Sequence, residues 1–224
     1  MRKLIFVILI IVSVSTYSQK IDIGLHAGFV SASYFNADNS NNVNTSAISS
    51  YQIGATSEFK LNQHWYFQTG LSWVEKGSVK ARSFIATSGN STTIKIDYLQ
   101  LPANMKYKFQ LNKDLKGFVG AGFYLSAGIS GTDIGNDLVY GTGAIVPVNN
   151  KVVFTTNQTP SQNYTSVNPF DFGYNAFAGI EYKHFVVELN YGKGLSKVEV
   201  APIKQYQNQT MGISVGYVWS LKKK

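Results

Sequence analysis

Residues 98–109 read YLQLPANMKYKF, an alternation of apolar and polar side chains that passes through Pro102 without losing phase. One face carries the six apolar residues Leu99, Leu101, Ala103, Met105, Tyr107 and Phe109. A period of two residues is typical of a β-strand with two unlike faces. Proline lacks the N–H that a sheet ladder needs and is found mainly at edges or bulges. The stretch therefore predicts a strand that lacks one ladder bond at Pro102, with a bulge or a water molecule at that point, and the proline ring lies on the polar face.

The same period recurs in eight segments after residue 20, and no segment has a strong helical period. The segments lie near 21–29, 51–59, 65–73, 98–109, 119–129, 172–182, 185–191 and 211–219. Glycine is frequent on the polar face of these segments, where a soluble sheet would carry mostly Lys, Glu and Thr. The interior of an eight-stranded barrel is narrow enough to favour such small residues. We therefore expect the small and polar face to line a barrel lumen and the apolar face to contact lipid.

The connections between the segments support a membrane barrel. Short gaps at 61–64, 110–116 and 183–184 alternate with long gaps at 36–50, 79–92, 131–169 and 196–207. Outer-membrane barrels have an even number of strands, short periplasmic turns and long extracellular loops. The predicted fold is all-β, an eight-stranded antiparallel transmembrane β-barrel with that loop pattern, in preference to a soluble sandwich or a lipocalin-like barrel.

The first residues have the composition of a secretory signal peptide. Arg2 and Lys3 precede an apolar run from Leu4 to Val14, which is too short for a membrane-spanning helix. We expect residues 1–18 to be the signal peptide and residues 19–224 to form the barrel domain. Cleavage after Ser18 takes Arg2 and Lys3 from the 20 basic residues and leaves 18 against 12 acidic, a net charge of +6 in place of +8. The remaining lysines do not gather on one element, so no nucleic-acid partner is expected.

Charged residues on the polar faces predict a network inside the lumen, because buried charges need partners. Its expected members are Asp22, His26, Glu58, Lys106, Glu181 and Glu188, with Lys108 beside them. His26 with Glu58 would also suit a general base and its orienting carboxylate. That pair lies near the periplasmic end, away from the outer leaflet, so we expect no catalytic residues. The chain has no cysteine, and the sequence predicts neither a metal site nor a cofactor.

Three basic residues follow the third segment at the expected start of a long extracellular loop. They are Lys76, Lys80 and Arg82. Basic side chains at the outer leaflet bind phosphate groups by charge-assisted hydrogen bonds. The sequence therefore suggests that these three residues contact lipopolysaccharide.

Several of these segments resemble a known family. YLQLPANMKYKF, GAGFYLSAGISG, DFGYNAFAGIEY with VELNYGKGLSKV, and the closing ISVGYVW are similar to the PorT-like outer-membrane β-barrel domain of Bacteroidetes proteins. The resemblance spans essentially the whole mature chain and implies an eight-stranded barrel in the outer membrane. Because the namesake is associated with protein secretion and gliding, it also suggests an accessory role in such an apparatus. Lys222–Lys224 depart from the family pattern, since they follow the terminal aromatic residue that barrel-insertion machinery reads.

The expected function is a non-enzymatic role in envelope or surface interactions. Residues 131–169, the longest connection, are the candidate interaction loop, since loops on rigid scaffolds carry function. The expected partners are outer-membrane lipid, lipopolysaccharide, the insertion machinery and an envelope protein. A small-solute channel or transporter is the alternative, and a lipid-modifying enzyme comes third.

Overall fold

The computed structural model of the protein describes residues 20–36, 43–82, 91–138, 144–157, 164–200 and 206–221. The expected signal peptide lies outside these residues. Eleven strands occur in this part of the chain: β1 (Ile21–Asn36), β2 (Val43–Ser46), β3 (Ile48–Lys60), β4 (Trp65–Arg82), β5 (Ser91–Gln110), β6 (Leu115–Leu138), β7 (Ile145–Phe154), β8 (Tyr164–Val167), β9 (Phe170–Tyr182), β10 (Phe185–Gly194) and β11 (Tyr206–Leu221). No described helix is long and apolar enough to cross a membrane.

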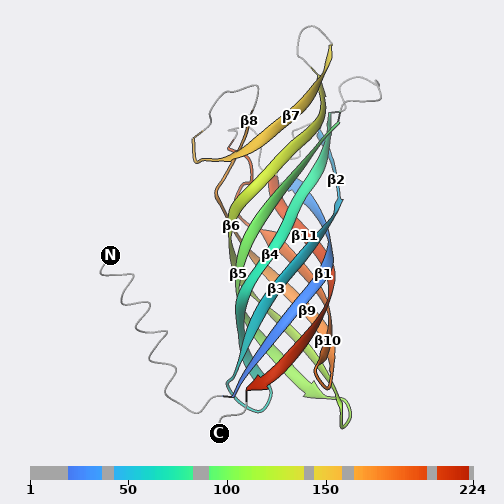
Figure 1. Ribbon diagram of the computed structural model, residues 1–224, viewed down its shortest axis with the longest axis vertical. Coiled ribbons are helices and arrows are strands. Elements are labelled where there is room, and N and C mark those ends of the chain that lie inside the picture. Colours follow the sequence, from blue (N-terminus) through green and yellow to red (C-terminus); the bar gives the residue numbers. More distant parts are fainter. Residues whose placement is uncertain are drawn as a thin grey trace, which may run out of the picture.

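Eight of the described strands close into a barrel, as predicted. Each pairs with its neighbour antiparallel, in the order β1, β3, β4, β5, β6, β9, β10 and β11, and β11 returns to β1. The eight predicted segments each fall within one of these strands. Figure 1 shows the closed wall, with the short turns at one end and the longer connections at the other. We call these the short-turn end and the long-loop end.

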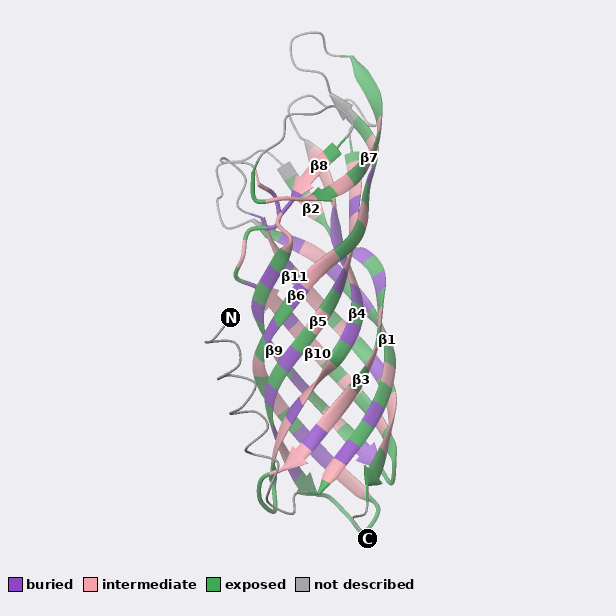
Figure 2. Ribbon diagram, turned by 60° about the vertical axis from the view of Figure 1, so that its left-hand side comes forward, coloured by how far each residue is buried: buried purple, intermediate pink, exposed green. Residues whose placement is uncertain are grey.

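The two faces of the strands point as the sequence predicts. Figure 2 shows buried and exposed residues alternating along the barrel strands. Outward apolar side chains remain exposed in every barrel strand, among them Phe29, Ile53, Leu101, Phe123 and Met211. Glycines on the inner face make room for rings inside the lumen, since a Cβ at Gly120 would collide with the ring of Phe177. The inner face thus also holds buried aromatic rings, which the sequence prediction did not include.

The bulge predicted at Pro102 is wrong, although Pro102 does face the lumen. The β4–β5 ladder stops after Thr69↔Ala103 and resumes in the same register at Ser72↔Gln100, so no extra residue is inserted. The Thr69 hydroxyl donates a hydrogen bond of 2.7 Å to the carbonyl oxygen of Pro102, a residue that has no ladder pair on β4. The break in the ladder at Pro102 is therefore accompanied by a hydrogen bond from the Thr69 side chain and not by a bulge.

The register shift of β5 lies elsewhere, between Asp97 and Tyr98. Asp97 pairs with Ser130 and Tyr98 with Gly128, which leaves Ile129 of β6 as the additional residue. A one-residue insertion moves the following side chains to the opposite face. Asp133 is consequently buried on the inner side of β6.

Replacing Thr69 with valine is expected to destabilise the barrel by about 1–3 kcal/mol, because the Pro102 carbonyl would face lipid without a donor. Thr69→Ser keeps the hydroxyl and is expected to change stability by less than about 0.5 kcal/mol. Equilibrium unfolding by urea in phospholipid vesicles measures both variants. Equal stability of the valine variant and the wild type would contradict the role given to this hydroxyl.

The barrel wall rises beyond its apolar band. Strands β4, β5 and β6 have 18, 20 and 24 residues, whereas about 9–11 residues cross a bilayer. Outward apolar residues on β4 and β5 end at Trp73 and Leu99, and the next outward residues are Glu75 and Asp97. The Trp73 indole donates to Asp97 at 3.0 Å, as expected for a ring at a membrane–water boundary. The remaining part of these strands therefore stands outside the hydrocarbon layer.

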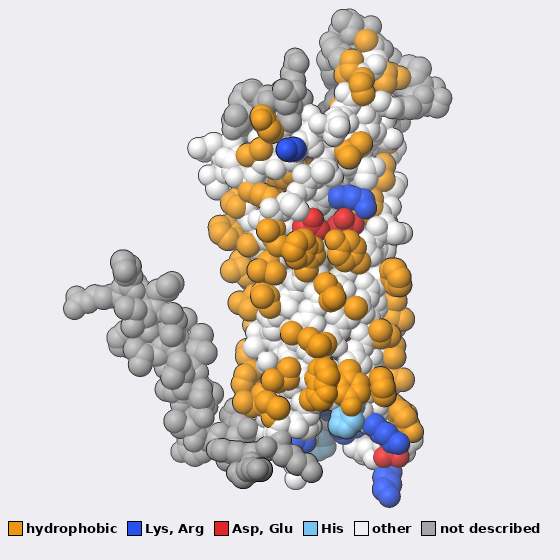
Figure 3. All heavy atoms as spheres, in the orientation of Figure 1, with side chains coloured by type: hydrophobic (Ala, Val, Ile, Leu, Met, Phe, Trp, Pro, Cys, Tyr) orange, Lys and Arg blue, Asp and Glu red, His pale blue; other side chains and the backbone are white. Residues whose placement is uncertain are grey.

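Aromatic rings mark the opposite boundary, at the short-turn end. Tyr107 packs against Trp65 and His64, with ring centroids 5.2 and 5.5 Å apart. Tyr217 packs in the same way against Phe185 and His184. Figure 3 shows the band of apolar side chains on the barrel wall, with charged side chains above and below it. Such aromatic girdles are a mark of transmembrane barrels.

A small sheet is built on the tall side of the barrel at the long-loop end. The upper part of β6 pairs antiparallel with β7, and β8 joins β7 in parallel. Strand β7 forms a hairpin with the extended end of β6. Figure 1 shows β7 leaning beyond the barrel rim.

Candidate functional site

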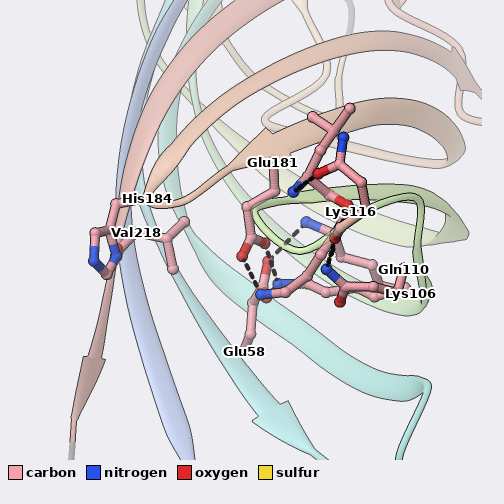
Figure 4. A network of polar contacts seen from close by, with 10 residues as sticks. Glu58, Lys106, Gln110, Lys116, Glu181, His184 and Val218 are labelled. Atoms are coloured by element: carbon pink, nitrogen blue, oxygen red, sulfur yellow. Dashed lines mark hydrogen bonds and ion pairs between the residues drawn. The ribbon is translucent and has the colours of Figure 1, made fainter.

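The short-turn end of the lumen is closed by a chain of alternating charges. Glu58 accepts from Lys106 at 2.7 Å and pairs with Lys108 at 2.6 Å. Lys108 also pairs with Glu181 at 2.7 Å, and Glu181 with Lys116 at 2.8 Å. Figure 4 shows Glu58 and Glu181 facing each other with ammonium groups between their carboxylates. The structure thus brings together three members of the predicted network, Glu58, Lys106 and Glu181, and adds Lys108 and Lys116.

A second polar centre lies further up the lumen around Asp171. Its Oδ2 accepts from Lys76 Nζ at 3.0 Å, from the Tyr124 hydroxyl at 3.3 Å and from Asn208 Nδ2 at 3.0 Å. Its Oδ1 accepts from the Ser196 hydroxyl at 3.0 Å. The side chains of Lys76 and Asp171 are 2% and 3% exposed, so this is a buried ion pair with most of its hydrogen bonds filled.

The lipopolysaccharide contact predicted for Lys76 and Lys80 is wrong, because both side chains point inward. Lys80 lies beyond the membrane-facing part of β4 and pairs with Glu199 at 2.7 Å and Asp133 at 3.8 Å. Burial alone would lower the pKa of Lys80, but the two carboxylates outweigh it and raise that pKa above its ordinary value. The side chain of the third residue, Arg82, lies outside the described residues.

An apolar cluster fills the lumen near the long-loop end, and we call it the apolar plug. It consists of Tyr34, Ile94, Ile96, Tyr98, Val167, Val198 and Tyr206. Val167 and Val198 come from connections that fold into the barrel mouth, where Asn168 N–H donates to the Val198 carbonyl at 2.8 Å. Their side chains are 0% and 2% exposed. The plug therefore closes the lumen against water at this end.

A cavity of about 100 Å³ with a mixed polar and apolar lining lies in the lumen, and Glu58, Lys106 and Tyr124 are among its lining residues. His26 lines it and its Nε2 lies 3.3 Å from the Ser72 hydroxyl, not beside Glu58. The suggested His26–Glu58 pair is therefore not formed, since both Glu58 oxygens are held by lysines. A cavity of this size and polarity accommodates a few water molecules.

Two members of the predicted network point inward without joining the ion chain. Glu188 lines the cavity and makes no ion pair or hydrogen bond with a described residue. Asp22 is buried beside Glu58, its partner in the β1–β3 register, and its Oδ1 has no hydrogen bond in the described structure. Within the described residues no three acidic or histidine side chains meet as metal ligands.

The sequence of this barrel matches the profile of a known protein family. The profile of the outer membrane protein beta-barrel domain matches residues 17–199, which is most of the chain. The chain belongs to this family. The protein is accordingly localised to the outer membrane, and its short turns face the periplasm while its long loops are extracellular.

Three solved structures resemble this family member in fold. The attachment invasion locus protein Ail of Yersinia pestis shares 11% identity over 88% of this chain and 98% of its own, with a TM-score of 0.40. Neisserial surface protein A shares 12% sequence identity over 87% of this chain and 96% of its own, with a TM-score of 0.41. OprG from Pseudomonas aeruginosa shares 10% sequence identity over 91% of this chain and 98% of its own, with a TM-score of 0.48. No curated protein matches the chain.

The alternation in the sequence already indicated that Lys76 and Lys80 point inward, although the prediction placed them at the membrane surface. Ser72, Lys76 and Lys80 share the even-numbered face of β4, and the phase continues beyond the expected strand end. The prediction ended the segment at residue 73 and placed Lys76 and Lys80 at the start of a loop, which removed that information. Asp171 lay on the predicted polar face of its segment, but the contacts that make it a hub come from four other parts of the chain.

Proposed function

We propose that the protein is a non-enzymatic interaction protein of the cell envelope, which holds an extracellular β-sheet above the outer leaflet for a protein or glycan partner. The observation that carries this proposal is the construction of β7. Its alternate residues Val152 and Phe154 pack against the apolar plug. The residues between and before them, including Asn149, Lys151 and Val153, are exposed. The sheet is thus anchored to the barrel core on one face and presented to the outside on the other.

The closed lumen favours this role over a small-solute channel or transporter. A permeating solute would have to displace the apolar plug, the Lys76–Asp171 pair and the chain of charges at the periplasmic end. Each buried pair costs about 3–5 kcal/mol to break by loss of one partner. The lipid-modifying alternative is disfavoured as well, because His26 lies inside the lumen, where acyl chains have no room.

The resemblance to PorT-like barrels supports a finer proposal, an accessory role beside a secretion or gliding apparatus in a Bacteroidetes envelope. In this proposal residues 1–18 direct export, and barrel-insertion machinery places the chain among outer-membrane lipid and lipopolysaccharide. The partner would then be an envelope protein that meets the extracellular sheet.

Photo-crosslinking in intact cells tests the interaction role. A crosslinking residue at Asn149 or Val153 of β7 is expected to capture a defined protein or glycan, because both side chains are exposed above the membrane. The same residue at the lipid-facing Ile213 is the matched control and is expected to capture lipid only. Identical adducts from both surfaces, or none from β7, would contradict the proposal.

Planar-bilayer recording tests the closed lumen separately. We expect no resolved single-channel currents from the wild-type protein, because side chains fill the lumen at both ends. The readout is conductance at several applied voltages, with a water-filled porin as the positive control. Steady currents from the wild type would favour the channel alternative.

A further inference from the structure

The periplasmic end of the barrel carries a set of lysines that form no ion pair within the described part of the chain. We call Lys20, Lys60, Lys113 and Lys183 the rim lysines. None of them makes an ion pair with a described residue, and Lys20, Lys113 and Lys183 are exposed. The buried lysines of the lumen neutralise carboxylates within the barrel, but the rim lysines have no such role among the described residues.

Acidic side chains offset only part of the charge of this rim, and one of them, Asp22, is buried beside Glu58 two residues from Lys20. Asp114 is the exposed acidic residue in the described periplasmic turns. Glu181, which is also near this end, is already held by Lys108 and Lys116. At the extracellular boundary, by contrast, Lys95 is paired with Glu75 at 3.3 Å and Asp97 lies close by. Among the described residues, the four rim lysines thus outnumber the acidic side chains near them that are left to pair.

The turns that carry the rim lysines are held in fixed positions. The Asn112 side chain accepts from the backbone N–H groups of Asp114 and Leu115, which shapes the β5–β6 turn. The N–H of Lys183 in the β9–β10 turn donates to the Asp114 carbonyl at 2.9 Å. Lys183 itself has a φ of 55°, a left-handed conformation suited to a tight hairpin turn. The two turns are docked, so the backbone segments that carry Lys113 and Lys183 are held next to each other.

The rim lies directly beside the inner aromatic girdle. The Lys183 ammonium is 5.4 Å from the ring centroid of Tyr182, a lipid-facing residue that is 50% exposed. Figure 3 shows basic and histidine side chains just below the lowest apolar side chains of the wall. This is the height at which the phosphates of inner-leaflet lipids lie relative to interfacial aromatic rings. The charges are therefore within reach of lipid headgroups.

We propose that the rim lysines bind the phosphate groups of anionic phospholipids in the inner leaflet of the outer membrane. The docked turns with Lys113 and Lys183 form one locus, and Lys20 and Lys60, joined by a backbone hydrogen bond of 3.2 Å, form another. Each locus offers two ammonium groups to one phosphate region. A lysine near an anionic membrane surface contributes about fivefold in binding.

Native mass spectrometry of the purified mature protein with phosphatidylglycerol and phosphatidylethanolamine tests this inference. The wild type is expected to retain phosphatidylglycerol preferentially. For each of the double variants K113Q/K183Q and K20Q/K60Q, the affinity for phosphatidylglycerol is expected to fall about fivefold per charge removed. K151Q/K197Q removes two exposed extracellular lysines and is the matched control, with no expected change. Thermal unfolding of each variant in detergent, without lipid, verifies that the barrel is intact.

The same experiment separates the other sources of binding. Equal retention of both lipids by the wild type, or equal losses in the control and rim variants, would overturn the proposal. Displacement of phosphatidylglycerol by millimolar inorganic phosphate would point to a free-phosphate site and would also overturn it. Rim variants that retain lipid normally but lose a periplasmic protein in pull-down from cells would assign the rim to an acidic protein partner.

Discussion

Glu58→Gln is expected to destabilise the barrel by about 3–5 kcal/mol, because it leaves buried lysines without a full counter-charge. Glu58 is 1% exposed and holds Lys106 and Lys108 at once. Lys106 has no other ion-pair partner among the described residues, although its ammonium also lies 3.7 Å from the centroid of the Phe118 ring. Glutamine keeps the volume of the side chain and accepts one hydrogen bond, so the loss measures charge and not packing.

Urea unfolding in phospholipid vesicles, monitored by tryptophan fluorescence, measures this effect. Glu75→Gln is the control, because its partner Lys95 is 44% exposed and solvated, and we expect a loss below about 1 kcal/mol. The triple variant E58Q/K106M/K108M removes the unpaired charges and is expected to recover part of the lost stability. A Glu58→Gln barrel as stable as the control would show that the charge chain contributes little.

Asp171→Asn is expected to have a comparable effect, about 3–5 kcal/mol, and to loosen the extracellular end selectively. Lys76 is buried and would lose its counter-charge. Ser196 and Asn208, which connect Asp171 to the two sides of the connection between β10 and β11, would lose a charged acceptor. Since that connection supplies Val198 to the apolar plug, its weakening is expected to open the plug.

Hydrogen exchange resolved by residue distinguishes this local opening from a global loss of stability. We expect faster exchange at the amides of Leu195 and Val198, whose backbone hydrogen bonds hold the connection, than at the amide of Lys108 near the periplasmic end. Asp97→Asn removes an outward carboxylate that forms no ion pair with any residue the structure describes, and it is the control. Uniform acceleration along the barrel would contradict the assigned role of Asp171.

Much of the fold follows from local sequence because side-chain direction in a strand alternates residue by residue. That property predicted the lipid-facing row from Trp65 to Trp73 and the lumen position of Pro102, both of which the structure confirms. It failed where the expected segment ended too early, at Lys76, and where an additional residue reverses the phase, at Ile129. The Pro102 bulge failed for another reason, since the ladder keeps its register across the proline and Thr69 on the neighbouring strand donates to the Pro102 carbonyl oxygen.

The sequence by itself determined the barrel: alternation decides the two faces, and the lengths of the connections decide the order and orientation of the strands. It placed Glu58, Lys106 and Glu181 in the lumen without deciding their partners. Only the tertiary structure decided that Lys76 meets Asp171, 95 residues away, and that Val167 and Val198 close the barrel mouth. Closing the barrel brings distant strands face to face across the lumen, and a charge removed from water there is stable only beside the opposite charge that the closed wall places next to it.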